Sequence, residues 1–502
     1  MTTDPKLEKL KQILNEIADL DNAASLLHWD MQCYMPQEGA EARGNQIATI
    51  GRLAHENRTS EVLGKLLDDL APFAAQGDPD SDDVRLIQVT KRQYDKATKV
   101  PIDLVVEFSQ VTSSAHQVWE QARANNDFES FRPSLEKIFE LRRRFADCFA
   151  PYDHVYDPLL DEFEPGLKTA DVKAIFEALR PRQVELLQAI KARPQVEDAF
   201  LHQQYEDAKQ WDFGVQVLNQ IGYDWKRSRQ DRAAHPFTTN FSINDVRITT
   251  RIIPDNLGSA LFSTLHEGGH AMYELGVNQH YERTPLAGGT SLAIHESQSR
   301  MWENLVGRSL PFWQHFYPRL QQTFPAQLGN VSLEAFYKGV NKVEPSLIRV
   351  EADEATYNMH VMLRLELEIA VLEGKLAVKD LPEAWNARMQ EYLGLTPPND
   401  SKGVLQDVHW SGGMIGYFST YALGNLVSGQ LWECINTDIP DLPDQIRRGE
   451  FAALRGWLTE KVHQYGSKYE PQELVKRITG TKIDPAPYLR YLTEKYRSIY
   501  GF

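Results

Sequence analysis

Residues that bind metal ions and transfer protons stand together in the segment His266-Glu267-Gly268-Gly269-His270. Residues four apart on an α-helix share one face, so the two histidines can offer imidazole nitrogens to one ion. Glu267 lies beside the first histidine and can accept a proton from a water at that ion. This H-E-x-x-H arrangement is typical of hydrolytic zinc sites. A helix with two surface histidines is the alternative, but each mid-helix glycine is unfavourable by about 0.8–1 kcal/mol, which indicates that something needs the space.

A catalytic zinc site requires a third protein ligand and one open position. Downstream, the segment from 295 to 300, HESQSR, lies within an expected helix that runs to about Arg308. We interpret Glu296 as the third ligand, although spacing alone favours it only slightly over Glu303 or Glu282. Its simpler interpretation is a solvated helix carboxylate paired with Arg300.

The elements around this segment are expected to be mainly helical, because apolar residues recur at three- and four-residue spacing along most of the chain. The metal helix should begin near Asp255 or Asn256 and end at Gly276. Residues His235–Ile252 break the pattern and predict a small antiparallel strand pair. The stretch Ser346–Glu373 contains neither Gly nor Pro and predicts one long helix.

The whole chain has 502 residues, 42% of them hydrophobic and 25% charged, which allows a sizeable core. No linker or repeat is evident, so we expect a single domain over 1–502, with two helical lobes around a groove as the variant. A net charge of -16 disfavours nucleic-acid binding. No segment is apolar enough to span a bilayer, and three scattered cysteines fit a reduced, cytoplasmic protein in which they are buried packing residues.

Several separate motifs resemble the carboxypeptidase Taq family, M32, of metallocarboxypeptidases, and together they cover most of the chain. HEGGH resembles the zinc-binding motif of that family, and HESQSR resembles its second metal segment, which places the third ligand on Glu296. The remaining matches, in chain order, are the segment 27–30 LHWD with Met35-Pro36, 245–249 DVRIT, 348–353 IRVEAD and 403–410 GVLQDVHW. Ser419 departs from the family, where proline is expected.

The resemblance implies a mainly α, groove-shaped zinc peptidase with a small antiparallel β-sheet beside the active site. It also implies a homodimer that releases single residues from the free C-termini of peptides, with broad specificity. One Zn²⁺ per subunit is expected, and cobalt or manganese can substitute in a carboxylate-containing site.

In this interpretation Glu267 accepts a proton from the attacking water and passes it to the leaving amine. The oxyanion of the tetrahedral intermediate needs a further donor. His409, Tyr417 and Tyr421 are the candidates, against the ordinary alternative of half-buried packing residues.

A carboxypeptidase must also recognise a free carboxylate, for which the planar guanidinium of arginine is suited. Taken alone, Arg349 and Asp353 look like a surface pair one turn apart on the expected long helix. The resemblance instead favours Arg349 as the carboxylate anchor, with Arg247 as its competitor. Asp245, Arg247 and Thr249 alternate along a strand, share one face, and are expected to close one end of the groove.

Two other functions remain open at this stage. The same metal chemistry could serve an endopeptidase, a dipeptidyl carboxypeptidase or an aminopeptidase, which product size would distinguish. A non-catalytic helical peptide-binding protein is disfavoured because Glu267 is intact.

Overall fold

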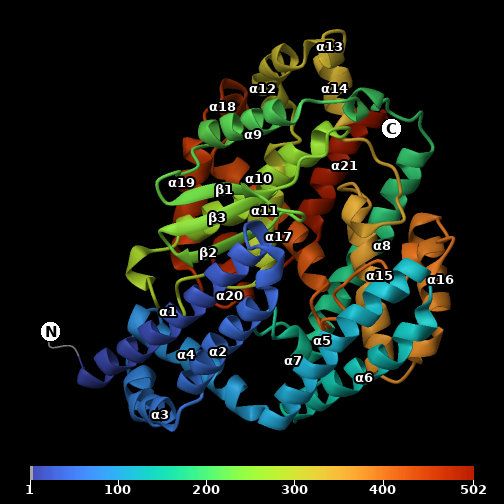
Figure 1. Cartoon of the computed structure of the whole chain (residues 1–502). Coiled ribbons are helices and arrows are strands. Elements are labelled where there is room, and N and C mark those ends of the chain that lie inside the picture. Colours follow the sequence, from blue (N-terminus) through green and yellow to red (C-terminus); the bar gives the residue numbers. More distant parts are fainter. Residues whose placement is uncertain (1–3) are drawn as a thin grey trace.

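Helices make up most of the structure, a computed structural model that describes residues 4–502 (Figure 1). The helices of the first half are α1 Pro5–Cys33, α2 Ala40–Arg58, α3 Glu61–Gln76, α4 Asp82–Lys99, α5 Ile102–Asn125, α6 Phe128–Asp147, α7 Asp157–Leu160, α8 Thr169–Lys191 and α9 Asp207–Ile221. Those of the second half are α10 Leu257–Leu275, α11 Leu292–Arg300, α12 Leu310–Thr323, α13 Pro325–Leu328, α14 Leu333–Gly339, α15 Tyr357–Leu372, α16 Leu381–Leu393, α17 Ser419–Asp438, α18 Leu442–Arg448, α19 Ala452–Lys461, α20 Pro471–Thr479 and α21 Ala486–Tyr500. The mainly α prediction is confirmed.

In the described part of the chain, one small sheet interrupts the helices. It consists of β1 Ser228–Arg232, β2 Thr238–Ser242 and β3 Asp245–Thr250 in the order β1-β3-β2. The predicted antiparallel pair is confirmed as β2 and β3. The prediction missed β1, which pairs in parallel with β3 and makes the sheet mixed. Its sequence, SRQDR, has no β-branched or aromatic residue, so no local pattern marks it as a strand.

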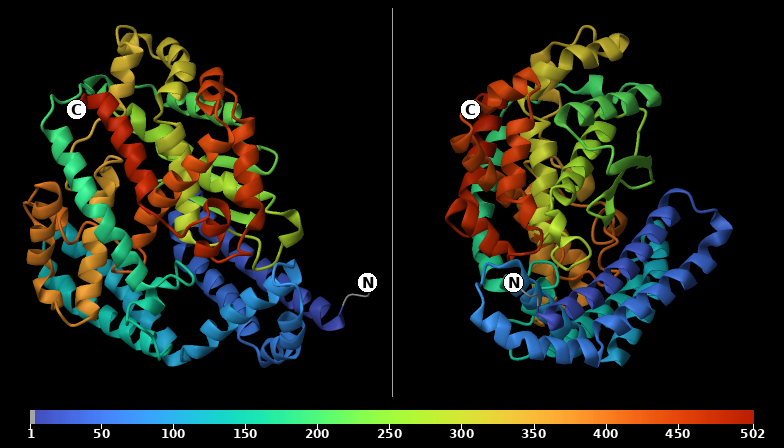
Figure 2. Two further views of the ribbon diagram at one scale, coloured as in Figure 1. Left: turned by 180° about the vertical axis from the view of Figure 1, so that it is seen from behind. Right: turned by 90° about the vertical axis from the view of Figure 1, so that its left-hand side faces the viewer.

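Among residues 4–502, buried apolar side chains gather in two clusters. The larger contains most helices from α5 onward together with Val246 and Ile248 of the sheet. The smaller joins α1, α3 and α4 to Ile243 and to a few residues after α10. Figure 2 shows the N-terminal helices, blue to cyan, gathered along one side of the molecule. The single-domain interpretation of 1–502 stays a prediction.

The long helix expected over Ser346–Glu373 is wrong for residues 346–356. Arg349–Glu351 forms a separate 3₁₀ turn, and α15 begins only at Tyr357. The reason is the side chain of Asp353, which accepts hydrogen bonds from the backbone N–H groups of Ala355 at 2.9 Å and Thr356 at 3.0 Å. Aspartate that bonds to the backbone ahead of it starts a helix rather than continuing one.

Two further expectations concern the cysteines and the membrane. All three cysteines are free and only partly buried, so the expectation of full burial is wrong, although Cys434 does pack against the larger apolar cluster. Among the helices of residues 4–502, none is both long and apolar enough to cross a bilayer.

Candidate active site

The helix α10 carries the HEGGH segment and begins where the sequence predicts. The side chain of Asn256 accepts a hydrogen bond from the N–H of Ser259, and Gly276 follows the last helical residue. A Cβ on Gly269 would lie 2.6 Å from the carbonyl oxygen of Gln298 and 2.7 Å from Cα of Ser299. The close approach of α10 and α11 therefore requires a glycine at 269. A Cβ on Gly268 would lie 3.0 Å from Cδ2 of Leu218 in α9.

Three side chains from these two helices point donor atoms at one place. Candidate donor atoms of His266, His270 and Glu296 all lie within 4.8 Å of one another. Oε2 of Glu296 is 3.6 Å from Nε2 of His266 and 3.5 Å from Nε2 of His270. Two imidazoles and one carboxylate match the three protein ligands that a catalytic zinc site uses.

The opposite sides of these groups are held by the protein. Nδ1 of His266 lies 2.9 Å from Oε2 of Glu303, and Nδ1 of His270 lies 2.7 Å from Nδ1 of His295. Oε1 of Glu296 accepts a hydrogen bond from Nε of Arg300 at 2.7 Å. Each imidazole thus uses one nitrogen for support and turns the other inward. Oε2 of Glu296 faces both imidazoles and also accepts a hydrogen bond from Oγ of Ser299 at 3.1 Å, so the three residues fit a metal ion.

The same contacts decide which glutamate joins the histidines. Glu303 lies behind His266, and Glu282 accepts the backbone N–H of Ile243 at 2.9 Å. Glu296 is the carboxylate that faces both imidazoles, and its pairing with Arg300 exists at the same time as this role. His295, which contacts His270, also lies with its Nε2 2.6 Å from Oε1 of Glu274.

Burial and charge set the protonation of this cluster. Burial raises the pKa of Glu267, and the nearby carboxylates Glu296 and Glu303 add to the effect, against His266 and a hydrogen bond from Thr238. Burial by itself would raise the pKa of Glu303 as well. The charge of Arg300 and the hydrogen bond and charge of His266 outweigh burial and lower the pKa of Glu303 to about 2. A raised pKa makes Glu267 a better proton acceptor, whereas Glu303 stays ionised.

Glu267 itself is buried and stands outside the three converging groups. Its Oε2 accepts a hydrogen bond of 2.6 Å from Oγ1 of Thr238, and the same hydroxyl lies 3.0 Å from the carbonyl oxygen of Glu267. This leaves Oε1 of Glu267 free of protein donors among residues 4–502. Sequence reasoning missed Thr238, since a threonine in a strand carries no signal that it faces a helix.

Arg349 lies in a buried network instead of on a helix surface. Its Nε donates to Oδ1 of Asp407 at 3.0 Å and its Nη1 to the hydroxyl of Tyr357 at 2.7 Å. Arg364 donates to Oδ2 of the same Asp407 at 2.7 Å. The alternative of a surface pair between Arg349 and Asp353 is therefore wrong. Sequence reasoning also missed Tyr357 and Arg364, which come close only through the tertiary fold.

His409, Tyr417 and Tyr421 are brought together beside this network. Nε2 of His409 lies 3.3 Å from the hydroxyl of Tyr421, whose ring centre is 4.9 Å from the guanidinium of Arg349. The rings of Tyr417 and Tyr421 are 5.3 Å apart. Burial and the charge of Arg349 lower the pKa of His409 to about 4, so its imidazole is neutral at pH 7.

A chain of contacts joins the three converging side chains to the network of Arg349. The guanidinium of Arg300, which bonds Glu296, lies 4.6 Å from the ring centre of Tyr357, and the hydroxyl of Tyr357 accepts a hydrogen bond from Arg349.

Ser419, where the family pattern has proline, is fully buried at the first position of α17. Proline is also tolerated at that helix position, so the exchange leaves the local backbone possible.

Arg247 and Asp245 lie on the sheet. Asp245 binds the guanidinium of Arg247 through two contacts of 2.9 Å, and Arg247 stacks 4.3 Å from the ring centre of Trp29 in α1. Thr249, expected on the same face, is buried and bonds the backbone of Phe237. The prediction that this trio closes the groove stays a prediction.

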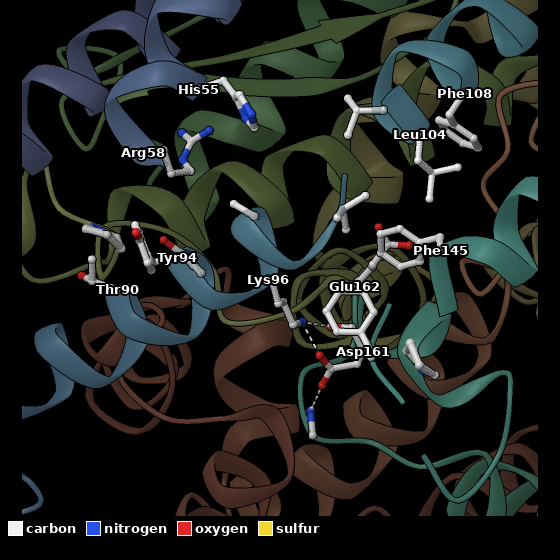
Figure 3. A pocket seen from close by; sticks show the side chains of 18 of the residues that line it. His55, Arg58, Thr90, Tyr94, Lys96, Leu104, Phe108, Phe145, Asp161 and Glu162 are labelled. Atoms are coloured by element: carbon white, nitrogen blue, oxygen red, sulfur yellow. Dashed lines mark hydrogen bonds and ion pairs between the residues drawn. The ribbon is translucent and has the colours of Figure 1, made fainter. Parts of the chain in front are cut away.

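A cavity of about 830 Å³ lies away from these residues, between α1, α4, α5 and α6 (Figure 3). Its lining is largely apolar and contains ion pairs such as that of Lys96 with Asp161. None of the candidate catalytic, metal or substrate-binding residues lines it.

Comparison with known proteins places this arrangement in context. Residues 9–496 match the family described as Carboxypeptidase Taq (M32) metallopeptidase. The chain is 40% identical to thermostable carboxypeptidase 1 of Thermus thermophilus over 100% of both chains, and 36% identical to carboxypeptidase 1 of Bacillus subtilis over 97% of both. The crystal structure of an M32 carboxypeptidase from Deinococcus radiodurans superposes with a TM-score of 0.96 at 41% identity, covering 99% of this chain and 100% of that one.

Proposed function

Because the chain belongs to the carboxypeptidase Taq (M32) metallopeptidase family and is therefore a metallocarboxypeptidase, we propose that it uses zinc to release single amino acids from the C-termini of peptides. The convergence of His266, His270 and Glu296 beside Glu267 carries this proposal. We further propose broad specificity, a homodimer and a cytoplasmic location, with cobalt or manganese as substitute ions.

The chemistry requires an activated water, a polarised carbonyl and a proton carrier. When bound, zinc supplies a Lewis acid that polarises the scissile carbonyl and acidifies the attacking water. Glu267 takes the proton of that water on its free carboxylate oxygen and delivers it to the leaving amine. Thr238 keeps the other oxygen in place, so the carboxylate needs little reorganisation during the reaction.

The neutral side chains near Arg349 supply the donors for the oxyanion. A neutral His409 donates without placing a second full charge in the site, and the hydroxyls of Tyr417 and Tyr421 are the alternatives. Removing one such donor typically lowers kcat by about 10²–10³.

Arg349 is the proposed anchor for the substrate carboxylate. Its contacts to Asp407 and Tyr357 use three of the five N–H groups that a guanidinium has, which leaves about two for a ligand. Arg364 is fully buried and bonded to Asp407, Gln406 and a backbone carbonyl. Nε and Nη2 of Arg247 already donate to the two carboxylate oxygens of Asp245.

The proposal is tested by digesting one peptide with a free and with an amidated C-terminus, followed by mass spectrometry. Stepwise loss of single C-terminal residues, abolished by chelation, by amidation and by Glu267→Gln, is the expected result. Dipeptide products would indicate a dipeptidyl carboxypeptidase, and cleavage of the amidated peptide would remove the role of Arg349. No cleavage across a wide peptide set by metal-loaded protein would favour a peptide-binding protein.

The metal and the oligomeric state are tested on the same preparation. Activity after reconstitution of the chelated protein with zinc, cobalt or manganese ranks the ions, and zinc is expected to bind most tightly of the three. Light scattering during gel filtration should give twice the chain mass of 57.4 kDa. A monomer mass would remove the homodimer from the proposal without affecting the catalytic assignment.

A further inference from the structure

Three residues of the proposed site, Asp407, His409 and Tyr417, lie in the segment 403–418, which forms neither a helix nor a strand. Asp407 is held by the two arginines described above. The imidazole of His409 has less support, because its Nδ1 has no hydrogen-bond partner among residues 4–502 and its Nε2 lies 3.3 Å from the hydroxyl of Tyr421. The position of this imidazole therefore depends on how the backbone of the segment is held.

One buried carboxylate, that of Glu368 in α15, bonds the segment at two places. Its Oε1 accepts a hydrogen bond from Nε1 of Trp410 at 2.7 Å, and its Oε2 accepts one from the backbone N–H of Gly416 at 3.0 Å. Trp410 directly follows His409 along the chain, and Gly416 directly precedes Tyr417. Each hydrogen bond therefore holds the residue next to one of the two proposed oxyanion donors.

Between these two places the segment closes on itself and packs tightly against α7. The N–H of Met414 donates to the carbonyl of His409 at 3.0 Å. A Cβ on Gly416 would lie 2.5 Å from the carbonyl oxygen of Leu159, and this glycine has a φ of 103°, which other residues rarely adopt. The stretch 409–416 is therefore compact, and its two hydrogen bonds to Glu368 fix where it lies.

A third donor reaches the same carboxylate from outside the segment. The hydroxyl of Tyr156 donates to Oε2 of Glu368 at 2.6 Å. A buried carboxylate is unfavourable unless it is hydrogen-bonded, and here both oxygens accept. Glutamine could not replace it, because the NH₂ group of the amide would face either the Nε1–H of Trp410 or the N–H of Gly416, and neither group can accept a hydrogen bond.

We propose that Glu368 is a positioning residue that holds the stretch 409–416 in place, so that His409 and Tyr417 are aimed at the oxyanion of the tetrahedral intermediate. This inference rests on the proposed function and deepens it. Arg349 has its own contacts, so recognition of the substrate carboxylate does not depend on Glu368. A displacement of a catalytic group by about 1 Å can lower the rate about a hundredfold, which makes the positioning measurable.

The positioning role is tested with Glu368→Gln in metal-loaded protein, using a peptide with a free C-terminus. This variant should lower kcat about 10–100-fold, with KM changed less than about threefold and metal content unchanged. The matched control is Tyr156→Phe, which removes the third donor but keeps both bonds to the segment, and should change kcat less than about threefold. Equal kcat losses in the two variants, or no loss in Glu368→Gln, would overturn the inference and leave the proposed function intact. No cleavage by the wild type would overturn both.

A second test asks whether Glu368 acts through these two side chains. In a protein that already carries His409→Gln and Tyr417→Phe, adding Glu368→Gln should lower kcat by less than about threefold more, because the groups that it positions are gone. An undiminished loss in this background would overturn the inference. If Glu368→Gln does not fold, Trp410→Phe replaces it, since this change removes one bond to the segment and leaves Glu368 two donors. It should lower kcat at least about fivefold at unchanged KM, and a loss below about twofold would overturn the inference.

Discussion

Replacing Arg349 by methionine removes the proposed carboxylate anchor and keeps much of the side-chain volume. The two N–H groups left by Asp407 and Tyr357 can make two charge-assisted hydrogen bonds to a carboxylate. Each such bond contributes about 1.5–3 kcal/mol, so the variant should lose roughly 10²–10⁴ in kcat/KM on free-acid peptides.

The assay that isolates this contact is a cycle of two proteins and two substrates. Wild type and Arg349→Met are each measured on the same peptide as a free acid and as an amide. The wild type should have a kcat/KM roughly 10²–10⁴ higher on the free acid than on the amide, and the variant should show almost no such difference. A variant that still prefers the acid by more than about tenfold would refute the assignment of Arg349 as the anchor.

The fold should survive this change. Asp407 keeps Arg364 as a partner at 2.7 Å, so the variant does not leave an isolated buried carboxylate. We expect a loss of no more than about 3 kcal/mol in the free energy of unfolding, with metal content unchanged. Loss of bound metal in Arg349→Met would mean that the kinetic cycle reports damage to the metal site.

Three further perturbations follow from the site. Glu267→Gln should lower kcat by about 10²–10⁴ while the metal stays bound, because Glu267 lies outside the three converging side chains proposed as ligands. Loss of metal from this variant, measured by elemental analysis, would contradict the prediction. Gly269→Ala should lower the free energy of unfolding by about 1–3 kcal/mol, because the backbone of α11 lies 2.6 Å from the new Cβ. The control Gly51→Ala, whose new Cβ has no atom within 4 Å, should be neutral or stabilising, and thermal melts compare the two variants. Burial and Arg349 depress the folded pKa of His409 to about 4, so the unfolded chain binds this proton first as the pH falls below about 6.5, and the wild type loses stability between pH 6.5 and 4. His409→Gln should lack about 2–3 kcal/mol of that loss at pH 4.5, and equal pH profiles for both proteins in denaturant titrations would contradict the assignment.

The sequence alone determined the features that depend on neighbouring residues along the chain. The pairing of His266 with His270 follows from the 3.6-residue helical repeat, whatever packs around the helix. The start of α10 at Asn256 and the turn between β2 and β3 follow from local hydrogen-bonding and turn preferences. These contacts join residues that are only a few positions apart, so the order of residue types along the chain is enough to predict them.

Only the tertiary structure decided which distant groups join the local motif. By spacing alone, three glutamates were almost equally good candidates for the third metal ligand. Glu296 faces both imidazoles because Gly269 lets α11 approach α10 closely. The same holds for β1, whose polar sequence becomes a strand only against β3, and for the shared Asp407 between two arginines. Such contacts join residues tens of positions apart, and their strength depends on burial and on the helices that surround them, which a one-dimensional pattern does not contain.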